Sequence, residues 1–147
     1  MIPFMNRRGF VKCGAGASAT LGASLAGAAD DGTMTVAVIG HTGRGNYGHG
    51  LDTVWRSVPS ATLVAVADPD AAGLAEAGER LGLGKEALHP DYRAMLQEVR
   101  PDLVAVCPRH VDQHRDMALA AIEAGVRGIY IEKPFLRSPA ECDEVLT

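Results

Sequence analysis

The sequence predicts an α/β fold, specifically a doubly wound parallel sheet of the Rossmann type. Two patterns indicate this class: short apolar runs alternate with segments of helical spacing, and a glycine-rich turn directly follows the first run. Such alternation produces parallel strands joined by right-handed crossovers, which place helices on both faces of the sheet. The 147 residues are 47% hydrophobic and 22% charged, so one ordinary globular domain is expected rather than a disordered or fibrous chain.

The first predicted strand covers residues 35–39 and is closed by Gly40. After the glycine-rich turn, apolar residues recur at helical spacing, namely Leu51, Val54, Trp55 and Val58. They predict a helix that Pro59 ends. The second predicted strand covers residues 61–67. Both strands are short and almost wholly apolar, as expected of strands that are covered on both faces.

The middle of the chain predicts a helix, an edge strand and a second helix. Asp70 is the expected N-cap of a helix over residues 71–81, and Gly82 is expected to terminate it. A short segment at residues 87–89 is interpreted as an edge strand. Asp91 is the expected N-cap of the next helix.

The last third predicts two more strands and two more helices. The strands cover residues 103–107 and 126–131, and a helix over residues 112–124 separates them. Ser138, with proline at the first helical position and glutamate three residues after the cap, predicts the start of a final helix.

Residues 1–29 are predicted to be a signal peptide of the twin-arginine type. The segment holds three basic residues and no acidic one, and then continues in small, weakly apolar residues. Residues 6–12 (NRRGFVK) resemble the twin-arginine motif, and Ala26-Gly27-Ala28 supplies a cleavage site. The stretch is too short and too glycine-rich for stable membrane insertion. We therefore expect export to the periplasm or beyond, with residues 30–147 as the domain; an ordinary basic N-terminus is the alternative.

Charge and cysteine usage argue against a nucleic-acid partner and against a metal site. The formal net charge of −4 lacks the basic excess of nucleic-acid-binding proteins, so no nucleic-acid partner is expected. Cys107 and Cys142 lack the spacing of a metal site or of a disulfide framework, so no metal is expected.

Residues 40–50 (GHTGRGNYGHG) contain the first functional motif. Gly43-Arg44-Gly45-Asn46-Tyr47-Gly48 fits G-x-G-x-x-G, and an alternative register starts at Gly40 with Thr42 in place of the middle glycine. The motif follows a predicted strand and precedes a predicted helix, the context in which backbone N–H groups bind a pyrophosphate. The sequence therefore predicts a dinucleotide-binding turn, with a plain tight turn as the alternative.

Asp68 stands at the end of the second predicted strand, about 20 residues after the glycine motif. A carboxylate at this place accepts hydrogen bonds from both ribose hydroxyls and repels a 2′-phosphate, which favours NAD over NADP. An acid that caps the following turn is the alternative interpretation.

The ends of the later strands supply the second functional motif. Ligands of open parallel sheets bind beyond the carboxyl ends of the strands, where the strand order reverses. Pro108-Arg109 and Glu132-Lys133-Pro134 follow two such strands, so we expect them to face the glycine turn. The Lys133 ammonium can then hold a substrate oxygen and stabilise the charge that develops as hydride leaves carbon. A solvated loop lysine is the alternative.

Taken in order, these motifs resemble the Gfo/Idh/MocA oxidoreductases over residues 34–147. The residues that carry the resemblance are Val36 to Gly40, Gly43-Arg44-Gly45, Ala67 to Asp70, Pro108 with His114 six residues later, and Glu132-Lys133-Pro134. The leader is also similar to that of exported glucose–fructose oxidoreductase relatives.

The resemblance implies NAD(P)-dependent oxidation or reduction of a sugar, inositol or related polyol. It implies that Lys133 lies beside the substrate and that Glu132 and Pro134 shape the nicotinamide pocket. It also implies that His114 faces this pocket from the start of a helix, although a helix-capping histidine is the alternative. The cofactor, NAD with NADP as the alternative, is expected to contact Gly40, Thr42, Gly43, Arg44, Gly45, Asp68 and Pro108, with Arg44 adding a charge-assisted bond.

Two features depart from the family pattern. Thr42 replaces the second glycine, which loosens the expected backbone approach to the pyrophosphate. No segment resembles the family's C-terminal α+β domain, which the resemblance implies as the source of the general base and of contacts for a homo-oligomer. We therefore expect a chain truncated at its C-terminus that binds a dinucleotide but turns over poorly alone. A non-catalytic binding or interaction domain is the second interpretation, and an AdoMet-dependent methyltransferase, which leaves Glu132-Lys133-Pro134 unexplained, is the third.

Overall fold

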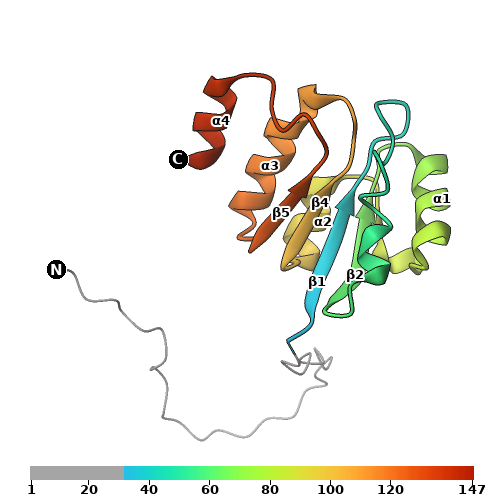
Figure 1. Ribbon diagram of the computed structural model, residues 1–147. Helices are drawn as coiled ribbons and strands as arrows, with labels where there is room; N and C mark the ends of the chain where they lie inside the picture. The colour runs from blue at the N-terminus through green and yellow to red at the C-terminus, as the bar shows by residue number, and fades with distance from the viewer. Residues whose placement is uncertain (1–31) are drawn as a thin grey trace, which may run out of the picture.

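Five parallel strands form one sheet in the order β3-β2-β1-β4-β5, in the part of the chain, residues 32–147, that a computed structural model describes (Figure 1). The strands are β1 (Met34–Ile39), β2 (Ala61–Ala67), β3 (Leu88–His89), β4 (Leu103–Val106) and β5 (Gly128–Ile131). The order reverses between β1 and β4, as in doubly wound nucleotide-binding sheets. The predicted Rossmann-type sheet is therefore confirmed.

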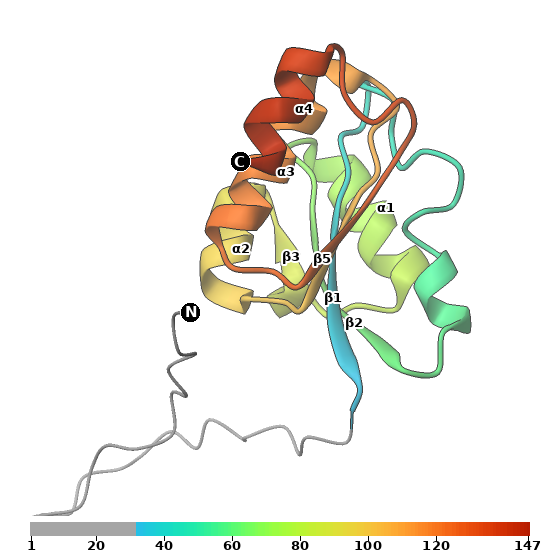
Figure 2. The same cartoon turned by 60° about the vertical axis from the view of Figure 1, so that its left-hand side comes forward.

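Helices cover both faces of this sheet. The α-helices are α1 (Ala71–Leu81), α2 (Tyr92–Val99), α3 (His114–Glu123) and α4 (Pro139–Leu146), and the short 3₁₀ helices are η1 (Val54–Ser57), η2 (Lys85–Ala87) and η3 (Val111–Gln113). The rotated view shows α1 and the segment before β2 on one side of the sheet, with α2, α3 and α4 on the other (Figure 2).

Two apolar clusters hold the layers together. Alternate residues of each strand point to opposite faces, so Ala37 and Ile39 pack toward α2 and α3, whereas Val38 packs toward α1. The central residues of β1 are completely buried, which explains why this strand reads as an uninterrupted apolar run.

The predicted helix ends are confirmed where a local bond specifies them. The Asp70 side chain accepts a hydrogen bond from the third residue of α1, and Gly82 ends that helix with φ +73°. Asp91 caps α2 in the same way, and the Ser138 side chain caps α4. These ends depend on side chain to backbone bonds within a few residues, so the sequence alone could predict them.

The helix predicted after the glycine turn is wrong. Residues 41–53 form a series of turns, and only the 3₁₀ helix η1 follows. Gly45, Gly48 and Gly50 have φ between +62° and +92°, and Asn46 has φ +53°. These left-handed conformations keep the glycine turn itself out of a right-handed helix, and helical backbone after it is limited to η1. Of the four apolar residues with helical spacing, only Val54 and Trp55 lie in η1.

Smaller differences concern element boundaries. The helix predicted over residues 112–124 begins as η3 and becomes α-helical at His114, and the strand predicted from residue 126 begins at Gly128. No helix within residues 32–147 is both long and apolar enough to cross a bilayer. The predicted signal peptide, residues 1–29, lies outside the described residues.

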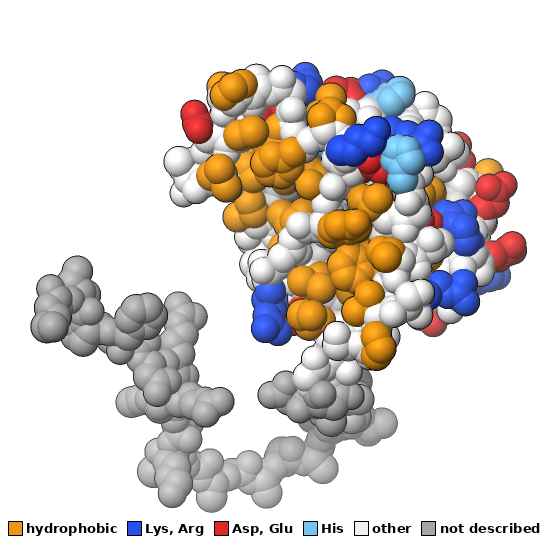
Figure 3. Space-filling model, in the orientation of Figure 1, with side chains coloured by type: hydrophobic (Ala, Val, Ile, Leu, Met, Phe, Trp, Pro, Cys, Tyr) orange, Lys and Arg blue, Asp and Glu red, His pale blue; other side chains and the backbone are white. Residues whose placement is uncertain are grey.

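One face of the molecule carries exposed apolar side chains. Figure 3 shows them gathered over the side that carries β5 and α4. Tyr130 on the edge strand β5 is 48% exposed and packs edge-on against Trp55, and Leu146 on α4 is 78% exposed. The exposed apolar side chains therefore lie at the β5 edge of the sheet.

Candidate functional site

The strand register aligns the carboxyl ends of the central strands. Ile39 at the end of β1 pairs with Ala67 of β2 and with Val106 of β4, and Val106 pairs with Ile131 of β5. The residues that follow these ends therefore stand in one row along the sheet edge, and they are Gly40, Asp68, Cys107 and Glu132. The structure thus brings together the strand ends that the sequence predicted to face one crevice.

Two glycines let the turn after β1 approach its neighbours closely. Gly45 has φ +92°, and a Cβ atom there would lie 2.3 Å from the backbone nitrogen of Arg109. Gly48 has φ +62°, and a Cβ atom there would lie 2.3 Å from Oε2 of Glu132. A side chain at either position would collide with the segment after β4 or β5, so this turn needs glycine for packing as well as for backbone conformation.

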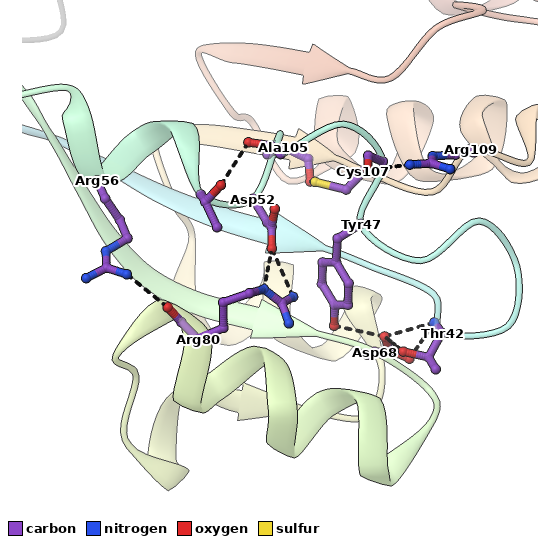
Figure 4. Close-up of polar contacts among 12 residues, drawn as sticks. Thr42, Tyr47, Asp52, Arg56, Asp68, Arg80, Ala105, Cys107 and Arg109 are labelled. Atoms are coloured by element: carbon purple, nitrogen blue, oxygen red, sulfur yellow. Dashed lines mark hydrogen bonds and ion pairs between the residues drawn. The ribbon is translucent and has the colours of Figure 1, made fainter.

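Asp68 is completely buried and faces the glycine turn (Figure 4). Its carboxylate accepts hydrogen bonds from the backbone N–H of Thr42 (2.9 and 3.1 Å to the two oxygens) and from the Thr42 hydroxyl (2.8 Å). It also accepts bonds from the Tyr47 hydroxyl (2.8 Å) and the Asp70 N–H (2.9 Å). Asp68 therefore lies beside the turn, as predicted, with its oxygens bonded to protein groups.

Tyr47 connects Asp68 to an ion pair on the α1 side of the sheet. The Arg80 guanidinium lies 4.7 Å from the centre of the Tyr47 ring and pairs with the buried Asp52 carboxylate at 2.9 Å. Burial, together with the hydrogen bond to Asp68 and its negative charge, raises the pKa of Tyr47 well above its ordinary value. The phenol is therefore a hydrogen-bond donor at neutral pH.

The glycine turn is also bonded to the segment after β4. His41 Nδ1 lies 2.6 Å from Oε1 of Gln113, and Arg44 forms an ion pair with Asp112. Both Arg44 and Asp112 remain almost half exposed, so this ion pair contributes at most about 1 kcal/mol. The Arg44 guanidinium, predicted to contact phosphate, is therefore only weakly held in this arrangement.

Glu132 joins the end of β5 to the glycine turn. Its buried carboxylate accepts bonds from the His49 N–H (3.0 Å), the His49 ring (2.9 Å) and the Lys133 N–H (2.9 Å). Burial acts to raise the pKa of Glu132, but the hydrogen bonds from His49 and Lys133 outweigh it and lower the pKa below its ordinary value. Glu132 is therefore a charged connection between the glycine turn and the backbone of Lys133.

Lys133 differs from its neighbours because its side chain is exposed. Within residues 32–147, the Lys133 ammonium makes no ion pair. The peptide bond between Lys133 and Pro134 is cis. The Lys133 backbone, in contrast, is held by the bond to Glu132. Lys133 is thus a cation on an anchored backbone at the sheet edge.

His114 is completely buried and bonds to backbone carbonyl groups of two segments. Its Nε2 lies 2.6 Å from the Pro108 oxygen, and its Nδ1 lies 3.0 and 3.1 Å from the oxygens of Pro134 and Phe135. The ring therefore connects the turn after β4 to the turn that follows Lys133. Its contacts are those of a positioning residue, and its place facing the nicotinamide pocket stays a prediction.

A cavity of about 180 Å³ lies beside Asp68 at the sheet edge. Its wall includes Gly40, His41, Pro69, Tyr92, Gln113 and Met117. Next to it, a Cβ atom built on Gly43 would meet no atom within 4 Å, so this part of the turn faces open space. Space beside the carboxylate and beside Gly43 fits the adenosine and pyrophosphate parts of a dinucleotide, and the Gly43 N–H donates to Oδ1 of Asn46 at 3.0 Å.

The sequence did not predict the roles of Tyr47, His49, Asp52 and Arg80. Tyr47 and His49 stand within residues 40–50, where the sequence predicted roles only for glycines, Thr42 and Arg44. Asp52 and Arg80 lie on separate segments, and no spacing rule indicates that they pair. Within residues 32–147, no three His, Cys, Asp or Glu side chains are arranged to hold a metal ion.

The fold and this edge define the class of protein as a nucleotide-binding Rossmann domain. Residues 34–147 match the family model described as "Oxidoreductase family, NAD-binding Rossmann fold" (GFO_IDH_MocA). The chain therefore belongs to the Gfo/Idh/MocA oxidoreductase family, which confirms the family predicted from the motifs.

Relatives of known structure or activity share this domain. The chain is 34% identical over 87 residues to D-apiose dehydrogenase of Paraburkholderia graminis, covering 59% of this chain and 22% of that protein. It is similar to the crystal structure of myo-inositol 2-dehydrogenase from Lactobacillus plantarum (TM-score 0.63, 26% identity, 78% of this chain and 32% of that one). It is also similar to a probable dehydrogenase from Thermotoga maritima (TM-score 0.64, 25% identity, 76% and 32%). The chain thus spans about a third or less of the length of these relatives.

Proposed function

We propose that the chain is the cofactor-binding part of an exported oxidoreductase that transfers hydride between a nicotinamide dinucleotide and a hydroxyl-bearing carbon of a sugar, inositol or related polyol. The observation that carries this proposal is the convergence of the glycine turn, Asp68 and Lys133 at one sheet edge in a chain of this family. The names of two relatives, D-apiose dehydrogenase and myo-inositol 2-dehydrogenase, support the carbohydrate-like substrate class.

Each part of the edge has a separate task in the proposed mechanism. The backbone around Gly43 binds the pyrophosphate, and Asp68 binds the adenosine ribose and disfavours a 2′-phosphate, so NAD is the preferred cofactor. The bound nicotinamide supplies the hydride acceptor or donor. The Lys133 ammonium binds the substrate oxygen and stabilises its developing negative charge, and the bonds made by Glu132 and His114 hold the backbone on either side of it.

Several parts of the proposal concern features outside the described residues. The arginine pair Arg7-Arg8 supports export through the twin-arginine route. We propose that the general base and any contacts between subunits come from a substrate domain like that of the longer relatives.

Titration of the purified chain with NADH and with NADPH tests the proposal, with binding followed by calorimetry. Saturable binding of NADH, tighter than that of NADPH, is expected. Asp68→Ala is expected to weaken NADH binding about tenfold or more, because the ribose hydroxyls lose a charged acceptor. Exposed Asp143→Ala on α4 serves as the matched control. Absence of NADH binding to the folded wild-type chain would contradict the proposed function.

A further inference from the structure

The Asp68 carboxylate has no free acceptor position for a ribose. A carboxylate offers about four lone-pair positions. Four groups already occupy them: the N–H groups of Thr42 and Asp70, and the hydroxyls of Thr42 and Tyr47. Asp68 is also 0% exposed. A ribose that donates two hydrogen bonds to this carboxylate must therefore displace two of the present donors.

The four donors differ in how easily they can leave. The N–H groups of Thr42 and Asp70 belong to the backbone of the glycine turn and of the α1 N-terminus. The two hydroxyls are side-chain groups, and Tyr47 belongs to a turn with left-handed glycines on both sides, Gly45 and Gly48. The groups that can leave are thus two hydroxyls, the same number and kind of donor that a ribose brings.

Space for the Tyr47 side chain exists beside its present position. A cavity of about 440 Å³ between the glycine turn and α1 is lined by Tyr47 itself, together with Thr42, Gly73, Glu76 and Arg80. Figure 4 shows the phenol pointing toward Asp68, with the Asp52–Arg80 pair on the side of α1. The ring is 8% exposed and belongs to the apolar cluster on the α1 side of the sheet, and this cavity is the space into which its hydroxyl can move away from Asp68.

We propose that Tyr47 is an affinity-determining residue of the dinucleotide site: in the free protein its hydroxyl, together with that of Thr42, holds the acceptor positions of Asp68 that the cofactor ribose takes. This inference rests on the proposed function. Cofactor binding is then an exchange of hydroxyl donors, and the free energy of the Tyr47–Asp68 bond is subtracted from the binding free energy. The contact of Arg80 with the ring stabilises the free state and adds to that cost.

The test is calorimetric titration of NADH into the wild-type chain and into Tyr47→Phe. The phenylalanine variant keeps the ring and loses the hydroxyl, so it is expected to bind NADH about three- to tenfold more tightly. Tyr130→Phe, the same chemical change on the exposed face of β5, is the matched control and is expected to leave the Kd unchanged. Thr42→Val removes the second hydroxyl with little change of shape and is also expected to tighten binding.

A double-mutant cycle separates this mechanism from a general effect on the fold. If Tyr47 acts through Asp68, Tyr47→Phe tightens binding in the wild-type background and has no such effect in an Asp68→Asn background. Circular dichroism confirms that each variant is folded before titration.

The outcomes distinguish the inference about Tyr47 from the proposed function on which it rests. Tighter binding by Tyr47→Phe or Thr42→Val that depends on Asp68 supports the inference. NADH binding by the wild type with equal or weaker binding by both variants overturns the inference and leaves the proposed function intact. No NADH binding by any folded variant overturns both.

Discussion

Lys133 and Glu132 are adjacent residues with opposite environments. The Glu132 carboxylate is 2% exposed and bonded to three donors, whereas the Lys133 side chain is exposed at the same sheet edge. A buried carboxylate of this kind stabilises the local backbone, and an unpaired ammonium remains available to a ligand. The two residues of one motif therefore differ in role: Glu132 positions the backbone, and Lys133 is the residue proposed to contact substrate.

Replacement of Lys133 tests its proposed role in a protein that includes the substrate domain. Lys133→Ala is expected to lower kcat about 100-fold, because it removes the cation that stabilises charge on the substrate oxygen. The Kd for NADH is expected to change less than about threefold, because binding of the dinucleotide depends on other groups. Steady-state kinetics and calorimetry give the two values. Exposed Lys85→Ala on η2 is the control, and unchanged kcat in Lys133→Ala would contradict the assignment.

His114 provides a residue-level test of stability. His114→Ala removes the buried ring from its three carbonyl contacts and opens a cavity, so it is expected to lower the free energy of unfolding by about 3 kcal/mol. Urea denaturation measures this change. Exposed His110→Ala is expected to stay within about 0.5 kcal/mol of the wild type. A similar small effect for both variants would show that His114 does not hold these turns together.

At the scale of elements, the glycine turn makes tertiary contacts that sequence patterns do not predict. It bonds to the segment after β2 through Asp68, to the segment after β4 through Arg109, and to the end of β5 through Glu132. These contacts surround the turn, whose backbone is left-handed at Gly45, Gly48 and Gly50. The helix predicted after the turn is present only as the 3₁₀ helix η1.

The bond between β5 and the glycine turn is expected to depend on pH. Glu132 has a pKa below its ordinary value of 4.5 in the folded protein, so its stabilisation is complete above that value and is lost as the pH falls through the lowered pKa. Glu132→Gln is therefore expected to cost about 1–3 kcal/mol of unfolding free energy near pH 7, and less at acid pH.

Urea denaturation of wild type and Glu132→Gln, compared near pH 7 and below about pH 4, measures this dependence. The exposed Glu123→Gln on α3 is the control, with little expected difference at either pH. A cost for Glu132→Gln that is the same at both pH values would show that the charge of Glu132 is not the stabilising feature.

At the scale of the whole molecule, the proposed export depends on the predicted leader, residues 1–29. Replacement of Arg7 and Arg8 by lysine is expected to block export through the twin-arginine route, which depends on the arginine pair and not on charge alone. Cell fractionation of an epitope-tagged protein measures its delivery to the periplasm. Lys12→Arg keeps the pair and is expected to be exported normally, and periplasmic delivery of the double lysine variant would contradict the predicted leader.

Much of the fold could be predicted because its information is local. β2 and α1 have the predicted boundaries, since β2 is a continuous apolar run and α1 begins at Asp70 and ends at Gly82. The glycine motif and Asp68 could be placed at one edge because parallel strands end on the same side of a sheet. The bonds that occupy Asp68 could not be predicted, because Tyr47 comes from a turn whose path depends on three other segments.

The sequence by itself determined the alternation of strands and helices, the family, and the residues that gather at the sheet edge, because apolar periodicity, capping residues and ordered motifs act over short distances along the chain. Only the tertiary structure decided how those residues are used. It buried Asp68 under the hydroxyls of Tyr47 and Thr42, turned His114 toward backbone carbonyls, and left the Lys133 side chain exposed. The physical reason is that burial and hydrogen-bond partners come from segments far apart in the chain, and they exist only once the sheet has assembled.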